Sequence, residues 1–258
     1  GQEGGNGVLD VLEGTVTPSG KLTDTIARDI ADYPSTGNYG DEKRNVYQED
    51  IYVGYRYFET FAKDKVLYPF GFGLSYTTFA VEAKLETAGS ADADTAAVIS
   101  AQVTNTGAVA GKEVVQVYCE APQGAMGKPA RVLCGFAKTK ELAPGEDQTL
   151  QIAVPWYTLS SYDDGGVTGH RSCWVLEAGE YVFHAGTDVR SAAAVGSLTL
   201  EETKVVKEAE EACAPVTAFE RMKPQAGGQD GYQVMYEAAP LRTVNPGERR
   251  TKRLPENI

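Results

Sequence analysis

The sequence predicts a mainly β fold, namely an antiparallel β-sandwich preceded by a short, incomplete α/β piece and an aromatic-rich connector. Between residues 79 and 201 the chain has seven or eight short segments of alternating polarity, spaced roughly 10–20 residues apart. Turn sequences rich in Gly, Pro, Asn and Asp separate these segments. The connector at 47–79 holds six of the fourteen Tyr and five of the eight Phe.

The N-terminal residues 1–28 predict one helix and one strand. In segment 1–14 one helical stripe is apolar and consists of Val8, Leu9, Val11 and Leu12. Gly14 follows this stripe, and a glycine just past the last apolar residue is the usual signal for a helix end. After a turn at 17–20, residues 21–26 alternate like a strand. A lone helix and strand cannot bury their apolar faces, so this piece needs partners from elsewhere.

Residues 29–78 predict a loop followed by the connector. Segment 29–46 is rich in Asp, Tyr, Gly, Asn and Ser and is expected to be a surface loop. In the connector the hydrophobic residues keep neither a period of 2 nor one of 3.6, and glycines and Pro69 interrupt it. We therefore expect short extended pieces and turns. Because buried aromatic side chains stabilise strongly, the connector should be pressed between two packed bodies.

The β-sandwich is predicted over residues 79–201. Its expected strands are 80–85, 95–104, 112–120, 131–139, 148–154, 172–177, 181–185 and 195–201. In segment 95–104, Ala97, Ile99, Ala101 and Val103 fall on one face. Beyond the sandwich, segment 202–213 is rich in Ala, Glu and Lys and predicts a helix ended by Pro215, and 224–258 predicts a linker that leaves the domain.

Two ordered motifs in the connector resemble a known family. They are YQEDIYVGYRYF at 47–58 and YPFGFGLSYTTF at 68–79, and GQEGGNGVLDVLEG opens the chain. Together they resemble the β-glucosidase-like enzymes of glycoside hydrolase family 3, over most of residues 1–223. The resemblance implies that 1–28 end an α/β sandwich domain and that 79–201 form a fibronectin type III-like, immunoglobulin-like domain. The tail resembles the permuted subgroup, in which the catalytic barrel follows.

Composition excludes several function classes. The net charge of −12 argues against a nucleic-acid partner. The short basic cluster at 249–253 is interpreted as solvated linker, with contact to a polyanion as the alternative. The sequence contains no run of 18 apolar residues, so no membrane span is predicted. The four cysteines, at 119, 134, 173 and 213, form no C-x-x-C pair, so neither metal nor cofactor is expected. They are expected to be buried and reduced, which weakly favours the cytoplasm.

Glycoside hydrolysis needs two carboxylates, about 5–5.5 Å apart for retention of configuration or about 6.5–9.5 Å apart for inversion. Glu3 lies just before a short helix, so it is interpreted as a partner of the helix dipole rather than as an acid catalyst. Glu49 and Asp50 fit hydrogen bonding around the packed tyrosines, or pairing with Arg56. Asp163 and Asp164 open a turn that is expected to be solvated, with a metal or sugar contact as the alternative.

The resemblance implies an Asp nucleophile on the barrel and a Glu acid/base upstream of the opening motif. Neither position matches a residue of 1–258, so we expect no catalytic, cofactor-binding or metal-binding residue in this chain. The two histidines suggest no nucleophilic site, and His184 is expected on the surface. A sugar-binding platform could form from aromatic residues and one histidine, with core packing as the alternative; they are Trp156, Tyr157, Tyr162, His170 and Trp174.

The expected function is therefore a non-catalytic structural portion of a family 3-like protein. By resemblance, the whole protein would be a retaining β-glycosidase of the β-glucosidase type, and this chain would pack and position its catalytic domains. The expected partners are those remaining domains. One alternative is a β-sandwich module that binds carbohydrate or protein, and another is self-association through the apolar surfaces left open.

Overall fold

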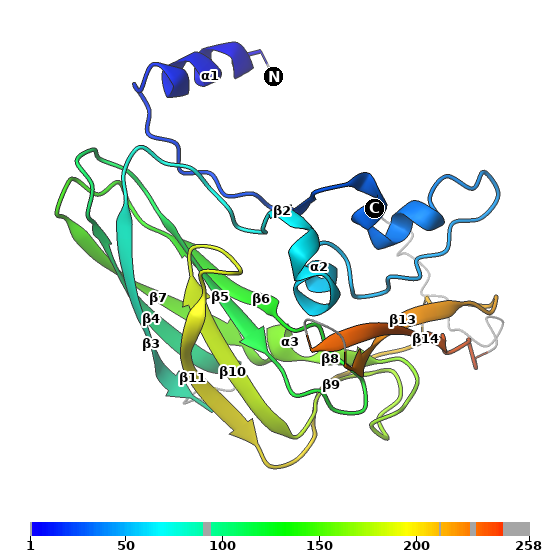
Figure 1. Cartoon of the computed structure of the whole chain (residues 1–258). Helices are drawn as coiled ribbons and strands as arrows, with labels where there is room; N and C mark the ends of the chain where they lie inside the picture. Colours follow the sequence, from blue (N-terminus) through cyan, green and yellow to red (C-terminus); the bar gives the residue numbers. More distant parts are fainter. Residues whose placement is uncertain (1, 90–93, 212, 228–230, 245–258) are drawn as a thin grey trace, which may run out of the picture.

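The computed structural model describes residues 2–89, 94–211, 213–227 and 231–244. Its centre is a sandwich of two antiparallel sheets (Figure 1). One sheet has the order β3-β4-β7, and its strands are β3 (Phe79–Ala88), β4 (Thr95–Asn105) and β7 (Asp147–Pro155). The other has the order β11-β10-β5-β6, and its strands are β5 (Val114–Glu120), β6 (Val132–Lys138), β10 (Gly179–Gly186) and β11 (Ala193–Leu200).

The register of β4 explains the core. Ile99 pairs with Ile152 of β7, and Val103 lies opposite Val81 of β3. Because successive residues of a strand point to opposite faces, this register sends the apolar set of each strand inward. The inward residues pack against Val115, Val117 and Phe183 of the opposite sheet, and together they form the main core. All eight predicted strand segments overlap a strand of the structure, so the antiparallel sandwich is confirmed.

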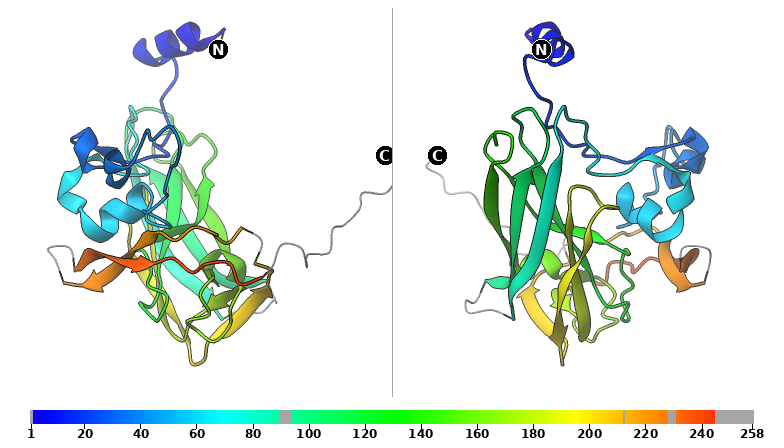
Figure 2. Two further views of the ribbon diagram at one scale, coloured as in Figure 1. Left: turned by 90° about the vertical axis from the view of Figure 1, so that its right-hand side faces the viewer. Right: turned by 60° about the vertical axis from the view of Figure 1, so that its left-hand side comes forward.

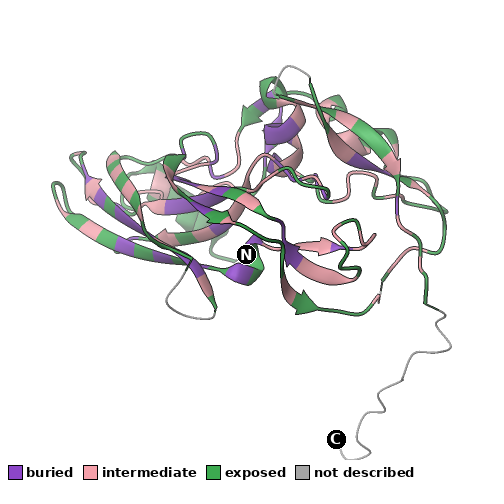
Figure 3. Ribbon diagram, turned by 90° about the horizontal axis from the view of Figure 1, so that it is seen from below, coloured by how far each residue is buried: buried purple, intermediate pink, exposed green. Residues whose placement is uncertain are grey.

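Buried and exposed residues alternate along the outer strands of the sandwich (Figure 3), but strand β5 is buried on both faces. Val115 and Val117 face the sandwich core, whereas Gln116 and Tyr118 face the connector. Tyr118 donates to Gln116 Oε1, and Gln116 Nε2 donates to the carbonyl oxygen of Thr187 at 2.8 Å. The outer face of this sheet is therefore a second packing surface, and the aromatic connector covers it.

The connector contains α2 (Tyr55–Phe61), a 3₁₀ turn at Lys63–Lys65 and β2 (Val66–Tyr68). The prediction of extended pieces and turns alone is wrong at α2. Seven residues are two turns of helix, too few to reveal a period of 3.6 among so many aromatic residues. The buried side chains of α2 include Tyr55 and Phe58. Tyr55 packs on Phe70 with ring centroids 4.5 Å apart, and it contacts Tyr118 at 6.1 Å.

Helix α1 (Gly4–Leu12) forms as predicted and is followed by Gly14 with a φ of 77°. It stands apart from the rest of the molecule, and none of its residues is buried (Figures 1 and 2). The strand predicted at 21–26 is wrong, because only β1 (Ile26–Ala27) pairs, with β2. Leu22 instead exchanges isolated hydrogen bonds with Gly71 and Phe72. Two 3₁₀ turns, Ile30–Asp32 and Pro34–Gly37, punctuate the predicted loop.

A third, smaller sheet lies at one end of the sandwich. It has the order β12-β9-β8 and consists of β8 (Ser161–Asp163), β9 (Cys173–Leu176) and β12 (Lys204–Glu208), with α3 (Trp156–Leu159) just before β8. The helix predicted at 202–213 is therefore wrong. The β-branched pair Val205 and Val206 favours a strand, and β9 offers a free edge, which outweighs the helix propensity of the surrounding Glu, Lys and Ala.

The linker predicted at 224–258 is wrong in its first half. Strands β13 (Glu220–Ala226) and β14 (Tyr232–Ala238) form a hairpin that lies against the connector (Figure 2). Met222 N donates to the carbonyl oxygen of Gln48 at 2.7 Å, and Arg44 Nη2 donates to that of Ala218 at 3.2 Å. The rest of the predicted linker from 245 onward, with the basic cluster 249–253, lies outside the described residues.

Candidate functional site

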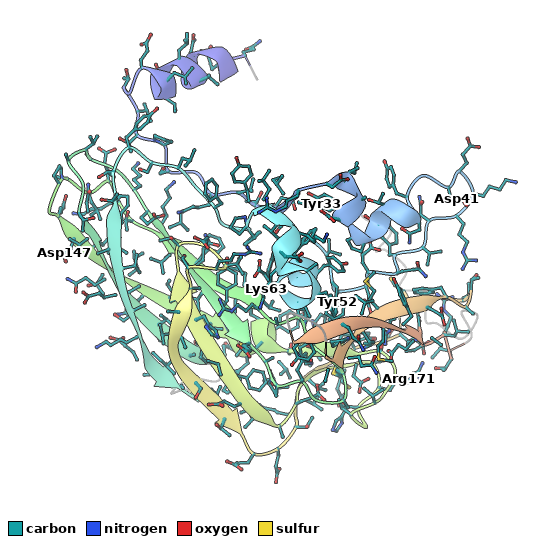
Figure 4. All side chains as sticks on the ribbon, in the orientation of Figure 1. Tyr33, Asp41, Tyr52, Lys63, Asp147 and Arg171 are labelled. Carbon is teal, nitrogen blue, oxygen red and sulfur yellow. The ribbon has the colours of Figure 1, made fainter. Side chains whose placement is uncertain are left out.

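A cavity of about 570 Å³ opens where the connector, the sandwich and the C-terminal hairpin meet. The connector contributes Asp50 and Arg56, the hairpin contributes Arg221, and the loop after β5 contributes Met126 and Lys128. Tyr52 lies behind this junction, between α2 and the hairpin (Figure 4), and its ring packs on Phe61 with centroids 5.1 Å apart. The cavity exists because three segments far apart in the sequence converge there.

Arg221 is the electrostatic centre of this junction. Its Nη1 lies 2.5 Å from Asp164 Oδ2 and 3.2 Å from Asp50 Oδ2, and its Nη2 lies 3.2 Å from Glu237 Oε1. A guanidinium presents five donors in a fixed fork, which suits several carboxylates at once. Lys223 joins the group through Glu237 at 3.5 Å and donates to the carbonyl oxygen of Met126 at 2.6 Å. This cluster ties together the hairpin, the connector and the loop after β8.

Burial perturbs the acids and bases of the cluster in different directions. Desolvation raises the pKa of Asp50, although Arg221 and Lys223 partly offset it. Desolvation also opposes the charge of Arg221, but the surrounding carboxylates outweigh it, and the pKa of Arg221 is raised. Burial lowers the pKa of Lys128, and Glu177, 3.3 Å away, works against that shift. The junction is therefore a network of compensated charges.

Asp163 fixes the loop beside Arg221. Its Oδ1 accepts from the backbone N–H groups of Gly166 and Val167 at 2.6 and 3.0 Å. Its Oδ2 accepts from the backbone and the hydroxyl of Thr168 at 2.8 and 2.6 Å. Burial opposes the charge, but these hydrogen bonds outweigh it and lower the pKa of Asp163. The solvated turn predicted here is therefore wrong, since Asp163 is buried and holds the loop in place.

An aromatic wall borders the cavity beside that loop. Trp174 of β9 packs on Tyr157 at 4.9 Å and on Tyr162 at 5.6 Å between ring centroids, and all three line the cavity. Trp156 instead is buried in the sandwich core, with Lys204 Nζ 4.5 Å from its ring centroid, and His170 is exposed. Of the five residues predicted as a sugar platform, the structure therefore brings together three.

Of the other predicted candidates, Glu3 and His184 lie apart from the cavity, whereas Asp50 lines it. Glu3 flanks α1 and accepts from Asn6 Nδ2 at 2.6 Å, without capping the helix backbone. Asp50 pairs with Arg221, so the predicted alternative of pairing with Arg56 is wrong. The surface position predicted for His184 is also wrong. His184 is buried on β10, with Arg131 Nη2 at 3.3 Å from Nδ1 and Glu120 Oε2 at 3.2 Å from Nε2.

The cysteines only partly match the prediction that they are buried. Cys119 and Cys134 are buried, and burial raises the pKa of both thiols, that of Cys134 to about 12. Such thiols are poor nucleophiles. Cys173 is half-buried, and the prediction is wrong for Cys213, which is exposed.

Glu237 was missed because it belongs to the segment 224–258 that was interpreted as linker. Arg221 and Lys223 were missed because they lie just before that segment, where no helix or strand was predicted. The signal that could have found them is the alternation YQVMYEA at 232–238, preceded by the glycine-rich turn sequence GGQDG. A turn of this composition followed by alternating residues is typical of a hairpin. The alternation in that segment rests on a few isolated apolar residues. Because charged and proline-rich sequence surrounds them, the pattern was too weak to predict a strand.

The chemistry open to this site is binding rather than proton transfer. Asp50, Asp164 and Glu237 all engage Arg221, so the three carboxylates are held by a permanent cation instead of facing a bond to be cleaved. Among the described residues, no group of three or more His, Cys, Asp or Glu side chains could hold a metal ion. Within that same part of the chain, every helix is too short or too polar to span a bilayer.

Comparisons with known proteins identify the two regions of the chain. Residues 1–76 match the Glycosyl hydrolase family 3 C-terminal domain, and residues 113–189 match the Fibronectin type III-like domain. A β-glucosidase of Ruminococcus albus is 53% identical over 255 residues, which are 99% of this chain and 26% of that protein. The chain thus spans about a quarter of the length of this relative.

Solved structures agree with the fold. The crystal structure of a β-glucosidase from Paenibacillus barengoltzii superposes with a TM-score of 0.87 at 54% identity, covering 95% of this chain and 27% of that one. β-Glucosidase 3B of Thermotoga neapolitana, solved in complex with α-D-glucose, superposes with a TM-score of 0.70 at 40% identity, covering 80% and 28%. The chain therefore belongs to glycoside hydrolase family 3, of which it carries C-terminal-domain sequence followed by a fibronectin type III-like domain.

Proposed function

We propose that this chain is the non-catalytic structural portion of a family 3 β-glucosidase and that it packs against and positions the catalytic domains. The observation that carries this proposal is the exposure of α1. Val8, Leu9 and Leu12 are 58, 54 and 72% exposed although they form one apolar stripe. A helix with such a stripe gains its stability from a packing partner, and among the described residues none buries the stripe of α1.

Further apolar side chains near α1 extend this open surface. Tyr76, in the connector, donates to the carbonyl oxygen of Val11 at 2.7 Å, and it is exposed together with Val16 and Leu74. We name this set, α1 with Val16, Leu74 and Tyr76, the α1 surface. Contiguous exposed apolar residues of this kind mark interaction sites. Its proposed occupant is the rest of the C-terminal domain, whose family profile matches residues 1–76.

The catalytic residues would then lie outside this chain. The matched relatives are named β-glucosidases, and this chain spans about a quarter of their length. The alignment with the Ruminococcus albus protein extends over 99% of this chain and so includes sequence beyond the fibronectin type III-like domain. The relative thus also continues past the fibronectin type III-like domain, as the arrangement with the barrel after the tail requires.

The proposal is tested by replacing one exposed leucine in the longer protein that carries this chain. Leu12→Asp should lower the yield of assembled enzyme and its hydrolysis of an aryl β-glucoside, because a carboxylate would be buried in the domain contact. Val216→Asp is the matched control, since Val216 is also 72% exposed but lies outside the α1 surface. Equal behaviour of the two variants would contradict the proposal.

A direct assay of the 258-residue chain completes the test. The chain alone should not hydrolyse an aryl β-glucoside. Turnover that disappears on changing one of its own carboxylates, such as Asp50→Asn, would show that catalysis resides here, and the structural role would have to be abandoned.

A further inference from the structure

We propose that the cavity at the junction of the connector, the sandwich and the hairpin is a binding site for a neutral oligosaccharide. This activity goes beyond the packing role, because none of the residues of the α1 surface lines the cavity. The proposal rests on the size of the cavity, the balance of its charges, its aromatic wall and the unused acceptors in its lining.

The size of the cavity suits a small ligand. Its volume of about 570 Å³ lies within the range of about 300–1,000 Å³ that small-molecule sites occupy. A second cavity of about 310 Å³ adjoins it, and Tyr162, Asp164 and Trp174 line both. A ligand that follows these residues can therefore extend from one cavity into the next, which favours a chain of rings over a single ring.

The charges that line the main cavity cancel. Four are acidic, namely Asp50, Asp163, Asp164 and Glu237, and four are basic, namely Arg56, Lys128, Arg221 and Lys223. A site for a phosphate or a polyanion would carry an excess of Lys and Arg, and a site for a cation would carry an excess of carboxylates. Because neither excess exists in the main cavity, its lining favours an uncharged ligand. The second cavity adds Glu210 and Glu211 and no basic residue, which disfavours an anionic ligand further.

The aromatic wall gives that ligand an apolar face to rest on. Tyr157 and Tyr162 pack against Trp174, and Tyr157 is 46% exposed. The face of an aromatic ring carries negative potential, which attracts the weakly positive C–H groups of a pyranose ring. The three rings are held at an angle to one another, with interplanar angles of 52° and 50°. Such a bent wall matches successive sugar rings better than one flat plate would.

The lining of the cavity also offers hydrogen-bond acceptors, from Asp50 and Glu237. Arg221 uses Oδ2 of Asp50 and Oε1 of Glu237. In the part of the chain that the structure describes, the second oxygens, Asp50 Oδ1 and Glu237 Oε2, accept no hydrogen bond. Sugar hydroxyl groups are donors that would satisfy both oxygens. The cavity therefore combines an apolar wall with fixed acceptors, the arrangement that a neutral, hydroxyl-rich ring requires.

The test is titration of the 258-residue chain with cellotetraose by calorimetry. Saturable binding is expected, and Tyr157→Ala should weaken it about fivefold through loss of a ring contact. Tyr236→Ala is the matched control, because Tyr236 is 47% exposed but does not line the cavity, and it should bind like the unchanged chain. A circular dichroism melt of each variant checks that folding is retained, and Tyr162→Leu replaces Tyr157→Ala if the latter unfolds.

A second measurement distinguishes the ligand class. Tetragalacturonate carries the same number of rings with four carboxylates and should bind at least about fivefold more weakly than cellotetraose, since the lining provides no net positive charge. Absence of saturable cellotetraose binding, equal losses in Tyr157→Ala and Tyr236→Ala, or tighter binding of tetragalacturonate would each overturn the proposal. These outcomes are independent of the Leu12→Asp experiment, so the two proposals fail separately.

Discussion

The guanidinium of Arg221, on the C-terminal hairpin, lies 3.2 Å from the carboxylate of Asp50, in the aromatic connector. This contact joins a segment near the end of the chain to one in its first quarter, and Asp164 and Glu237 complete the cluster. Since the hairpin contains only two strands, it has little core of its own. The cluster is therefore a main attachment of the hairpin to the rest of the molecule.

Replacing Arg221 should release the hairpin. In Arg221→Met, three carboxylates lose their shared cation, and we expect the free energy of unfolding to fall by about 1–3 kcal/mol, less than for a fully buried group because the acids are partly exposed. Urea denaturation measures this change, and limited proteolysis should cut near 220–238 first. Lys140→Met is the control, because its pair with Glu146 is exposed and should cost less than about 1 kcal/mol. Equal losses would contradict the assignment.

Asp163 should be sensitive even to an isosteric change. Asp163→Asn turns one of two accepting oxygens into a donor that faces backbone N–H groups or the Thr168 hydroxyl, and we expect a loss of about 2–3 kcal/mol. Asp147→Asn is the control, since Asp147 is exposed (Figure 4) and accepts only from Gln102 Nε2 at 3.2 Å among the described residues. In chemical denaturation, the midpoint of Asp163→Asn should be clearly lower than that of Asp147→Asn. Similar midpoints would show that the Asp163 contacts contribute little to stability.

The lowered pKa of Asp163 also predicts part of the acid sensitivity. Its stabilising contribution should be complete above the ordinary aspartate pKa of 3.8 and should be lost as the pH falls toward the lower folded value. Asp163→Asn should therefore flatten the dependence of unfolding free energy on pH below 3.8. An unchanged slope in that range would contradict the role assigned to the carboxylate.

His184 predicts a second pH effect in a milder range. Burial and the neighbouring Arg131 lower the pKa of His184, and Glu120 opposes them without reversing the shift. Below the ordinary pKa of 6.5 the unfolded chain takes up a proton that the folded chain does not, so stability should fall as the pH falls. His184→Gln should reduce this slope between pH values of about 6.5 and 5. Thermal melts across that pH range measure the change of stability with pH. Equal slopes for the unchanged chain and His184→Gln would contradict the assignment.

The strands of the sandwich were predictable because alternation in β4 and β7 reports burial directly, residue by residue. Helix α2 and strand β12 were not, since their local sequences favour other structures and tertiary partners decide the outcome. The cavity was harder to predict from the sequence than any single helix or strand. The sequence indicated Tyr157, Tyr162 and Trp174. Arg221 lines the same cavity only because a hairpin, hard to recognise among charged and proline-rich residues, folds back on the connector.

Gly71 is predicted to be the position where the connector tolerates least change. Its φ of 83° favours glycine, and a Cβ there would overlap the Gln116 amide and lie 2.9 Å from Asp188 Cα. Gly71→Ala should therefore cost about 1–2 kcal/mol for the backbone conformation and about 1–3 kcal/mol more for the overlap. Gly145→Ala isolates the first term, since Gly145 has a φ of 78° with open space around its Cβ position. Urea denaturation of the pair gives the packing cost as a difference, and equal losses would mean that the connector does not press on β5 as tightly as the structure indicates.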